Sequence, residues 1–222
     1  MQLPLEEHPQ RAYLHDELHS RPQPEYVIPV TVSFLLLLLG EAEVDRAREA
    51  LADLCRRFGA APPHGERHFA AQLGEIGVRW EQHTEFYTLT FARRPPDPRA
   101  PFAHPPIELV PPDWLERLPG QVLTAAHVAL VRDQERPADI PAQFEGQRVS
   151  GSKATDGAAA IWTAFRPQGD GFVRYLVAGR DLSPARAGRL VQRLLEIESY
   201  RMMAILGLPV ARAIGLSLRG ME

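Results

Sequence analysis

The sequence predicts an α+β fold in which a mostly antiparallel sheet packs against helices, one of them long and C-terminal. Residues 30–39 form a continuous apolar run with a β-branched start, typical of a strand that is buried on both faces. Residues 41–59 and 183–206 instead repeat apolar side chains at spacings of three and four, the pattern of amphipathic helices. Segments 67–94 and 147–179 contain short β-prone runs separated by glycine-containing turns, which indicates antiparallel strands.

Length and composition restrict the class of protein. With 222 residues and 45% apolar composition, the chain is long enough for one sizeable core, and we expect a single soluble domain over residues 1–222. The formal net charge of −3 carries no polybasic signature, so nucleic acid is not expected as a partner. Cys55 is the only cysteine, which excludes an internal disulfide and predicts a buried, inert thiol on a helix.

The sequence also restricts the cellular context. MQLPLEEHPQ at the start is polar and acidic, so it lacks the basic-then-apolar order of a signal peptide, and a cytoplasmic location is expected. The most apolar run, VIPVTVSFLLLLLG, has about half of the roughly 20 residues that a membrane-spanning helix needs. It is therefore interpreted as a buried strand.

Start and stop signals place the individual elements. Arg21-Pro22 ends a first helix because a residue before proline disfavours the helical region. Asp113 is a plausible cap of a short helix, and Ser183-Pro184 begins the terminal helix. Helices are expected at 9–19, 41–59, 113–118, 138–146 and within 183–218, and strands at 30–39, within 67–94, and at 121–133, 147–154, 158–167 and 171–179.

The two halves of the chain share an order of elements. Residues 27–93 and residues 121–179 each read as an apolar strand, a helix and then antiparallel strands. Residues 94–112 between them are too proline-rich for a regular element, so they are expected to cross the surface or separate two subdomains. A duplicated strand-helix-strands unit is therefore an alternative to a domain without internal repeat.

Two histidines stand four residues apart in LHDELHSRP. On a helix His15 and His19 project from one face, close enough to share a metal. In the zinc-protease pattern a glutamate follows the first histidine directly, whereas here Asp16 does and Glu17 comes one place later. The segment is therefore not interpreted as a zinc-protease helix.

WEQHTEF, residues 80–86, offers further ligands. If this segment is extended, His83 and Glu85 point to one face. Together with His15 and His19 they would form a set for a divalent metal. The alternatives are a hydrogen-bonded structural cluster or a ligand-binding cluster.

The terminal helix is rich in charged and polar side chains. Arg189, Arg193, Glu196, Tyr200 and Arg201 interleave with leucines at spacings of three and four. They could form a solvated face with salt bridges, a polar stripe that faces the sheet, or a surface that contacts a partner segment.

Three segments together resemble a known family. The segments that carry the resemblance are HPQRAYLHDELHSRP, WEQHTEF and GRLVQRLLEIESYRMMAILGLPVAR. The chain resembles domain-of-unknown-function family 3422, which consists of predicted membrane-anchored bacterial proteins. The resemblance spans nearly the whole chain and implies attachment to the cytoplasmic face of the inner membrane, through a C-terminal segment absent from this chain, but no activity. The residues that the matching segments nominate are Arg11, His15, Glu17, His19, Arg21, Trp80, Glu81, His83, Glu85, Arg189, Glu196, Glu198, Tyr200 and Arg201.

These observations leave three hypotheses for function. The first is a ligand-binding or sensory domain in which His15, His19, His83 and Glu85 converge. The second is a metal-dependent hydrolytic enzyme with those residues as ligands and Glu17 or Glu85 as the base. The third is an interaction module whose terminal helix pairs with a further segment or with a second copy, forming a homo-oligomer.

Overall fold

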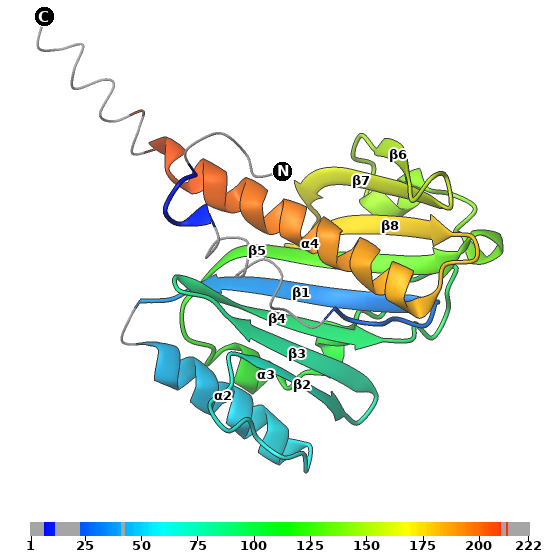
Figure 1. The fold of residues 1–222 in the computed structure, drawn as a ribbon. Coiled ribbons are helices and arrows are strands. Elements are labelled where there is room, and N and C mark those ends of the chain that lie inside the picture. Colours follow the sequence, from blue (N-terminus) through cyan, green and yellow to red (C-terminus); the bar gives the residue numbers. More distant parts are fainter. Residues whose placement is uncertain (1–6, 12–22, 41–42, 210–211, 213–222) are drawn as a thin grey trace, which may run out of the picture.

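A single eight-stranded sheet organises the protein in the computed structural model, which describes residues 7–11, 23–40, 43–209 and 212 (Figure 1). The strand order is β2-β3-β4-β1-β5-β8-β7-β6, and every neighbouring pair is antiparallel except β5 and β8. The strands are β1 (Val30–Leu38), β2 (His68–Leu73), β3 (Ile76–Gln82), β4 (Phe86–Arg93), β5 (Gln121–Arg132), β6 (Ser150–Ala154), β7 (Ala159–Pro167) and β8 (Val173–Gly179). The predicted α+β class is confirmed.

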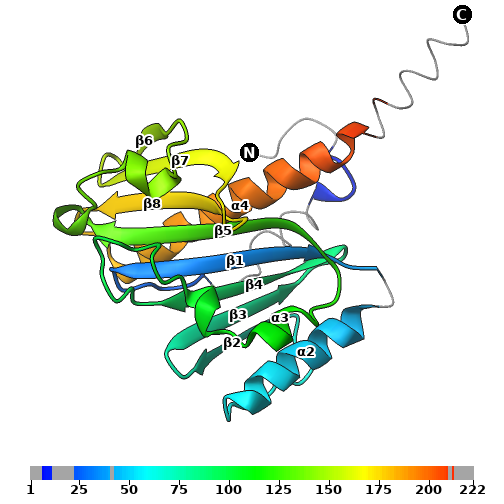
Figure 2. The same cartoon turned by 180° about the vertical axis from the view of Figure 1, so that it is seen from behind.

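Helices cover the two faces of this sheet. The α-helices are α2 (Val44–Arg57), α3 (Pro112–Leu115) and α4 (Pro184–Leu206), and short 3-10 turns occur at η2 (Pro106–Leu109), η3 (Asp133–Glu135) and η4 (Pro141–Phe144). In Figure 1 the long α4 crosses the near face, and the view from behind in Figure 2 brings α2 and α3 to the front.

β1 lies at the centre of the sheet because it presents apolar side chains to both faces of the sheet. Alternate residues such as Val32 and Phe34 join the core cluster beneath α4, whereas Leu35 and Leu37 join the cluster beneath α2. Leu35 is paired with Leu89 of β4 on one side and with Ala125 of β5 on the other. The predicted strand buried on both faces is confirmed.

α2 packs against the sheet with the apolar face that its sequence periodicity predicts. Ala47, Leu51, Leu54 and Cys55 are buried, and they belong to the core cluster on the side of the sheet opposite α4. Burial raises the pKa of the Cys55 thiol. The expected buried cysteine on a helix is confirmed.

The proline-rich segment 94–112 contributes to the core as well as crossing the surface. Phe102 and Val110 are buried, and the Thr31 hydroxyl of β1 donates to the Pro101 carbonyl at 3.2 Å. The prediction that Asp113 caps the next helix is wrong. Pro111 occupies that position, and Asp113 instead pairs with Arg57 of α2 at 2.9 Å.

The two predicted halves take mirrored places in the sheet. Counting outward from the centre, the first half runs β1, β4, β3, β2 and the second runs β5, β8, β7, β6. However, β4 is antiparallel to β1, whereas β8 is parallel to β5. The two halves share the order of their strands but not the relative direction of the first two, so an internal duplication stays a prediction.

α4 begins on the sheet and ends beyond it. The Ser183 hydroxyl accepts a hydrogen bond from the Arg186 amide, as the sequence predicts for the N-cap. Ser199 is the last buried residue of the helix, and Figures 1 and 2 both show the remaining turns projecting past the strands. In the described ranges, no helix combines the length and the apolar composition that crossing a bilayer requires.

Candidate functional site

The β3-β4 hairpin and the second half of α4 enclose a small pocket, here called the hairpin–helix pocket, with a volume of about 60 Å³. The sheet lines it with Phe34, Glu81, His83, Phe86, Thr88 and Thr90. The helix lines it with Leu195, Glu196, Ser199 and Tyr200. Two sequence motifs that are far apart in the chain, WEQHTEF and LEIESYR, therefore share one pocket.

Strand alternation decides which residues of the first motif reach this pocket. In β3 Trp80 and Gln82 face α2, where Trp80 is 1% exposed and Gln82 accepts hydrogen bonds from Arg48. Glu81 faces the opposite side, toward α4, and is paired with Thr88 in the register of β3 and β4. Trp80 was nominated as a binding residue, and the structure places it in the core instead.

The end of the first motif is not extended, so the condition under which His83 and Glu85 would share one face is not met. Residues 83–85 connect β3 to β4, and the His83 amide donates to the Phe86 carbonyl at 2.8 Å. The His83 ring stacks on the Phe86 ring with centroids 3.9 Å apart, whereas Glu85 is exposed and does not line the pocket. A turn reverses the chain here, so the alternation of a strand does not apply.

The polar groups of the pocket have identified partners. Glu81 forms an ion pair with Arg79 at 3.1 Å, and Glu196 accepts a hydrogen bond from the Gln192 amide at 2.9 Å. The Ser199 hydroxyl donates to the Leu195 carbonyl at 2.8 Å, so it is held along the helix. Arg193, which the sequence places three residues before Glu196, is exposed and makes no ion pair with it.

A buried carboxylate next to this pocket fixes α4 on the sheet. Glu198 is fully buried, and it accepts hydrogen bonds from Tyr175 at 2.6 Å, from Thr124 at 3.2 Å and from Arg201 at 2.6 Å. Burial and the hydrogen bond to Glu198 raise the pKa of Tyr175 far above its usual range, so the phenol is the donor. Of the five polar residues proposed for a stripe on this helix, Arg201 reaches the buried Glu198, whereas Arg193 and Tyr200 are exposed.

Two further nominated residues that the structure describes, Arg11 and Arg189, do not line the pocket. Arg11 is exposed and pairs with Glu7, and Arg189 is partly buried without lining the pocket. His15, Glu17, His19 and Arg21 lie outside the described residues, and their predicted convergence with His83 stays a prediction. Among the residues that the structure describes, no three His, Cys, Asp or Glu side chains are grouped as a metal site.

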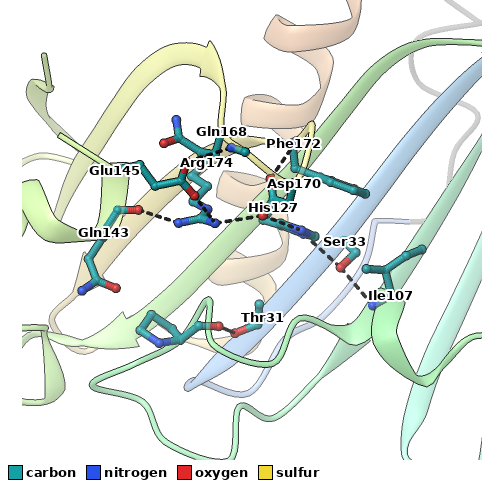
Figure 3. Close-up of polar contacts among 12 residues, drawn as sticks. Thr31, Ser33, Ile107, His127, Gln143, Glu145, Gln168, Asp170, Phe172 and Arg174 are labelled. Atoms are coloured by element: carbon teal, nitrogen blue, oxygen red, sulfur yellow. Dashed lines mark hydrogen bonds and ion pairs between the residues drawn. The ribbon is translucent and has the colours of Figure 1, made fainter. Parts of the chain in front are cut away.

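Sequence reasoning missed a second polar cluster, drawn in Figure 3, which lies on the face of the sheet opposite α4. Ser33 of β1 and His127 of β5 are fully or almost fully buried, and Ser33 Oγ lies 3.0 Å from His127 Nδ1. The Ile107 amide donates to Ser33 Oγ at 3.2 Å. The imidazole tautomer sets which of Ser33 Oγ and His127 Nδ1 donates, and His127 Nε2 lies 3.9 Å from Asp170 Oδ2.

Burial controls the charge of this cluster. Desolvation lowers the pKa of His127 to about 4 and outweighs the attraction of Asp170, so the imidazole is neutral at pH 7. Burial raises the pKa of Asp170, but hydrogen bonds from Arg174 and the Phe172 amide lower it more. The Phe172 ring covers the imidazole at a centroid distance of 4.0 Å.

The cluster contains the residue types of a hydrolytic triad, but its geometry favours a structural role. Ser33 is 0% exposed in the middle of the central strand, so a substrate carbonyl has no approach to Oγ in this conformation. Polar residues at Ser33 and His127, inside otherwise apolar strand patterns, were the only sequence signal for it. A single polar residue in an apolar strand indicates a buried hydrogen bond more often than a catalytic site.

The fold and the pocket define an α+β protein built on one sheet, with a polar pocket between a hairpin and a long helix. The chain belongs to the family described as Protein of unknown function (DUF3422), whose model matches residues 6–222. No match was found among curated proteins or among solved structures.

Proposed function

We propose that the domain binds a small molecule, or one end of it, in the hairpin–helix pocket. The observation that carries this proposal is the meeting of WEQHTEF and LEIESYR at one cavity. The pocket combines apolar walls from Phe34, Phe86 and Leu195 with a few polar groups, the composition usual for ligand sites.

The size of the pocket limits what it can hold. A volume of about 60 Å³ is far below the roughly 300–1,000 Å³ of pockets that bury a drug-sized ligand. It therefore suits a single functional group, with the rest of a ligand extending to solvent past Tyr200, which is 49% exposed.

Binding is favoured over catalysis by the state of the polar groups. Ser199 is held by the Leu195 carbonyl, and Glu81 is paired with Arg79, so neither is arranged as a nucleophile beside a base. In the metal-enzyme alternative His83 lines this pocket and Glu85 does not, whereas His15 and His19 lie outside the described residues.

Backbone amide NMR with a fragment library tests the proposal. Saturable shifts of the His83, Glu196 and Tyr200 amides are expected with at least one class of fragment. Thr90→Met, which extends a side chain into the pocket, should abolish those shifts, whereas Thr155→Met at the β6-β7 turn should not. A library that leaves the three amides unmoved would refute ligand binding here.

A second candidate is protein–protein contact through the end of α4. Ile197, Ile205, Leu206 and Leu208 are 41–56% exposed, and a helix end that is apolar on several sides is usually covered. We take a second copy of the chain as the partner, which keeps the homo-oligomer expected from the sequence. Light scattering should give a dimer that Ile205→Asp with Leu206→Asp dissociates; a monomer at all concentrations would exclude it.

Membrane attachment through a further segment, which the family resemblance implies, is retained as a proposal separate from the pocket. Flotation of a longer chain with lipid vesicles, beside residues 1–222 alone, tests it directly.

A further inference from the structure

The hairpin–helix pocket is acidic in its own lining. Two carboxylates, Glu81 and Glu196, reach it, and no arginine or lysine is among the described residues that line it. An ionised carboxylate only accepts hydrogen bonds, so a bound group must supply donors. An anionic ligand would be repelled by a carboxylate of the lining and is disfavoured.

Glu196 supplies the charge that a ligand would balance. Its carboxylate accepts a hydrogen bond from the neutral amide of Gln192 at 2.9 Å, and no cation of the described residues lies at ion-pair distance from it. Glu81 differs because Arg79 neutralises it at 3.1 Å. The neighbouring Glu198 is also neutralised, by Arg201 at 2.6 Å.

Aromatic rings form the walls around these groups. Phe34 is 4% exposed and held in the core, and Phe86 is fixed by its stack with His83 at 3.9 Å. The negative face of an aromatic ring attracts ammonium groups, most strongly where water is excluded. A carboxylate beside rigid phenyl rings is therefore a site for an organic cation more than for a metal ion, which needs several oxygen or nitrogen ligands.

We propose that the hairpin–helix pocket binds the ammonium group of a small amine, with Glu196 as the counter-ion and Phe34 and Phe86 as its walls. This inference rests on the proposed ligand-binding function and adds the chemical class of the ligand. The pocket volume of about 60 Å³ accommodates an ammonium or methylammonium head.

Amide NMR titration at constant ionic strength tests this class of ligand. The probes are methylammonium and tetramethylammonium chloride, with acetamide and sodium acetate as neutral and anionic counterparts and sodium chloride as the salt control. Saturable shifts at the Glu196 and Tyr200 amides are expected for methylammonium, whose N–H groups can donate to the carboxylate. Glu196→Gln should weaken that binding about tenfold or more, because it removes the charge and keeps the shape.

The matched control is Glu116→Gln, at an exposed position that does not line the pocket, and it should leave the affinity unchanged. Thermal melting of both variants verifies folding. Binding of acetamide or acetate in place of the ammonium probes would overturn the inference and leave the ligand-binding proposal standing. Ammonium binding that Glu196→Gln does not weaken would also overturn it, and no response to any probe or fragment would remove both.

Discussion

The Tyr175 phenol donates a hydrogen bond of 2.6 Å to the buried carboxylate of Glu198. Tyr175 lies on β8 and Glu198 on α4, so this bond connects the sheet to the helix that forms one wall of the hairpin–helix pocket. Arg201 and Thr124 complete the hydrogen bonds of this buried carboxylate.

Removing the phenol should destabilise the fold. Tyr175→Phe leaves one oxygen of a buried carboxylate without a donor, which should lower the free energy of unfolding by about 1–3 kcal/mol. Urea denaturation measures the change. Tyr200→Phe, at a side chain that is 49% exposed, is the control and should change stability by less than about 0.5 kcal/mol. Equal effects of both variants would contradict the assigned role of Tyr175.

His127 should make the protein less stable in mild acid. Its folded pKa of about 4 lies below the unfolded value of 6.5, so between those pH values the unfolded chain binds a proton that the folded chain does not. The free energy of unfolding should therefore fall as pH drops from 6.5 to 4, by on the order of 3 kcal/mol from this residue. Urea titrations at pH 7 and pH 4.5 measure the loss.

His127→Gln should reduce that loss, because the glutamine amide can still form a hydrogen bond with Ser33 but does not titrate. His64→Gln, at an exposed histidine, should leave the acid loss unchanged. If His127→Gln keeps the full pH dependence, the buried imidazole is not its source.

Gly188 permits the close approach of residues 23–26 to α4. A Cβ at position 188 would overlap the Pro24 carbonyl, and the adjacent Tyr26 amide donates to the Pro184 carbonyl at 3.1 Å. Gly188→Ala should therefore cost about 1–3 kcal/mol and speed hydrogen exchange of the Tyr26 amide.

Gly207→Ala is the matched control, since a Cβ at the end of α4 meets nothing within 4 Å. It should be neutral or slightly stabilising because alanine restricts the unfolded chain. Indistinguishable melting of the two variants would mean that residues 23–26 shift without cost.

The metal-dependent alternative makes a separate prediction. It requires that purified, metal-replete protein holds about one divalent ion per chain, and that His83→Ala or His15→Ala releases it. The control is His104→Ala, at an exposed histidine beside Glu108. Elemental analysis that finds no bound metal in the replete protein would end this alternative, whereas stoichiometric metal lost in both variants would support it over simple ligand binding.

Much of the local structure was predictable because it depends on periodicity. The continuous apolar run identified β1, and the 3.6-residue period identified α2 and α4 to within a few residues of their ends. Ser183-Pro184 predicted the N-cap of α4 because capping is decided within one turn of the helix. Asp113 failed as a cap because Arg57, distant in sequence, pairs with its carboxylate.

The candidate site was predictable only as a set of residues. The motifs nominated Glu81, His83, Glu196 and Tyr200, and all four line the pocket. They also nominated Trp80 and Glu85, which face the core and the solvent because of strand alternation and a turn. The contact between His127 and Ser33 was not predictable, because the sequence around a single polar residue in an apolar strand does not show which distant residue it will contact.

By itself the sequence determined which segments are strands and helices and which of their faces are apolar, since these follow from interactions within a few residues. Only the tertiary structure decided that α4 crosses the face of β4, β1 and β5, that Glu198 meets Tyr175, and that Glu196 and Glu81 share a cavity. The physical reason is that the order of strands and the docking of a helix depend on contacts between distant residues, which no local pattern encodes.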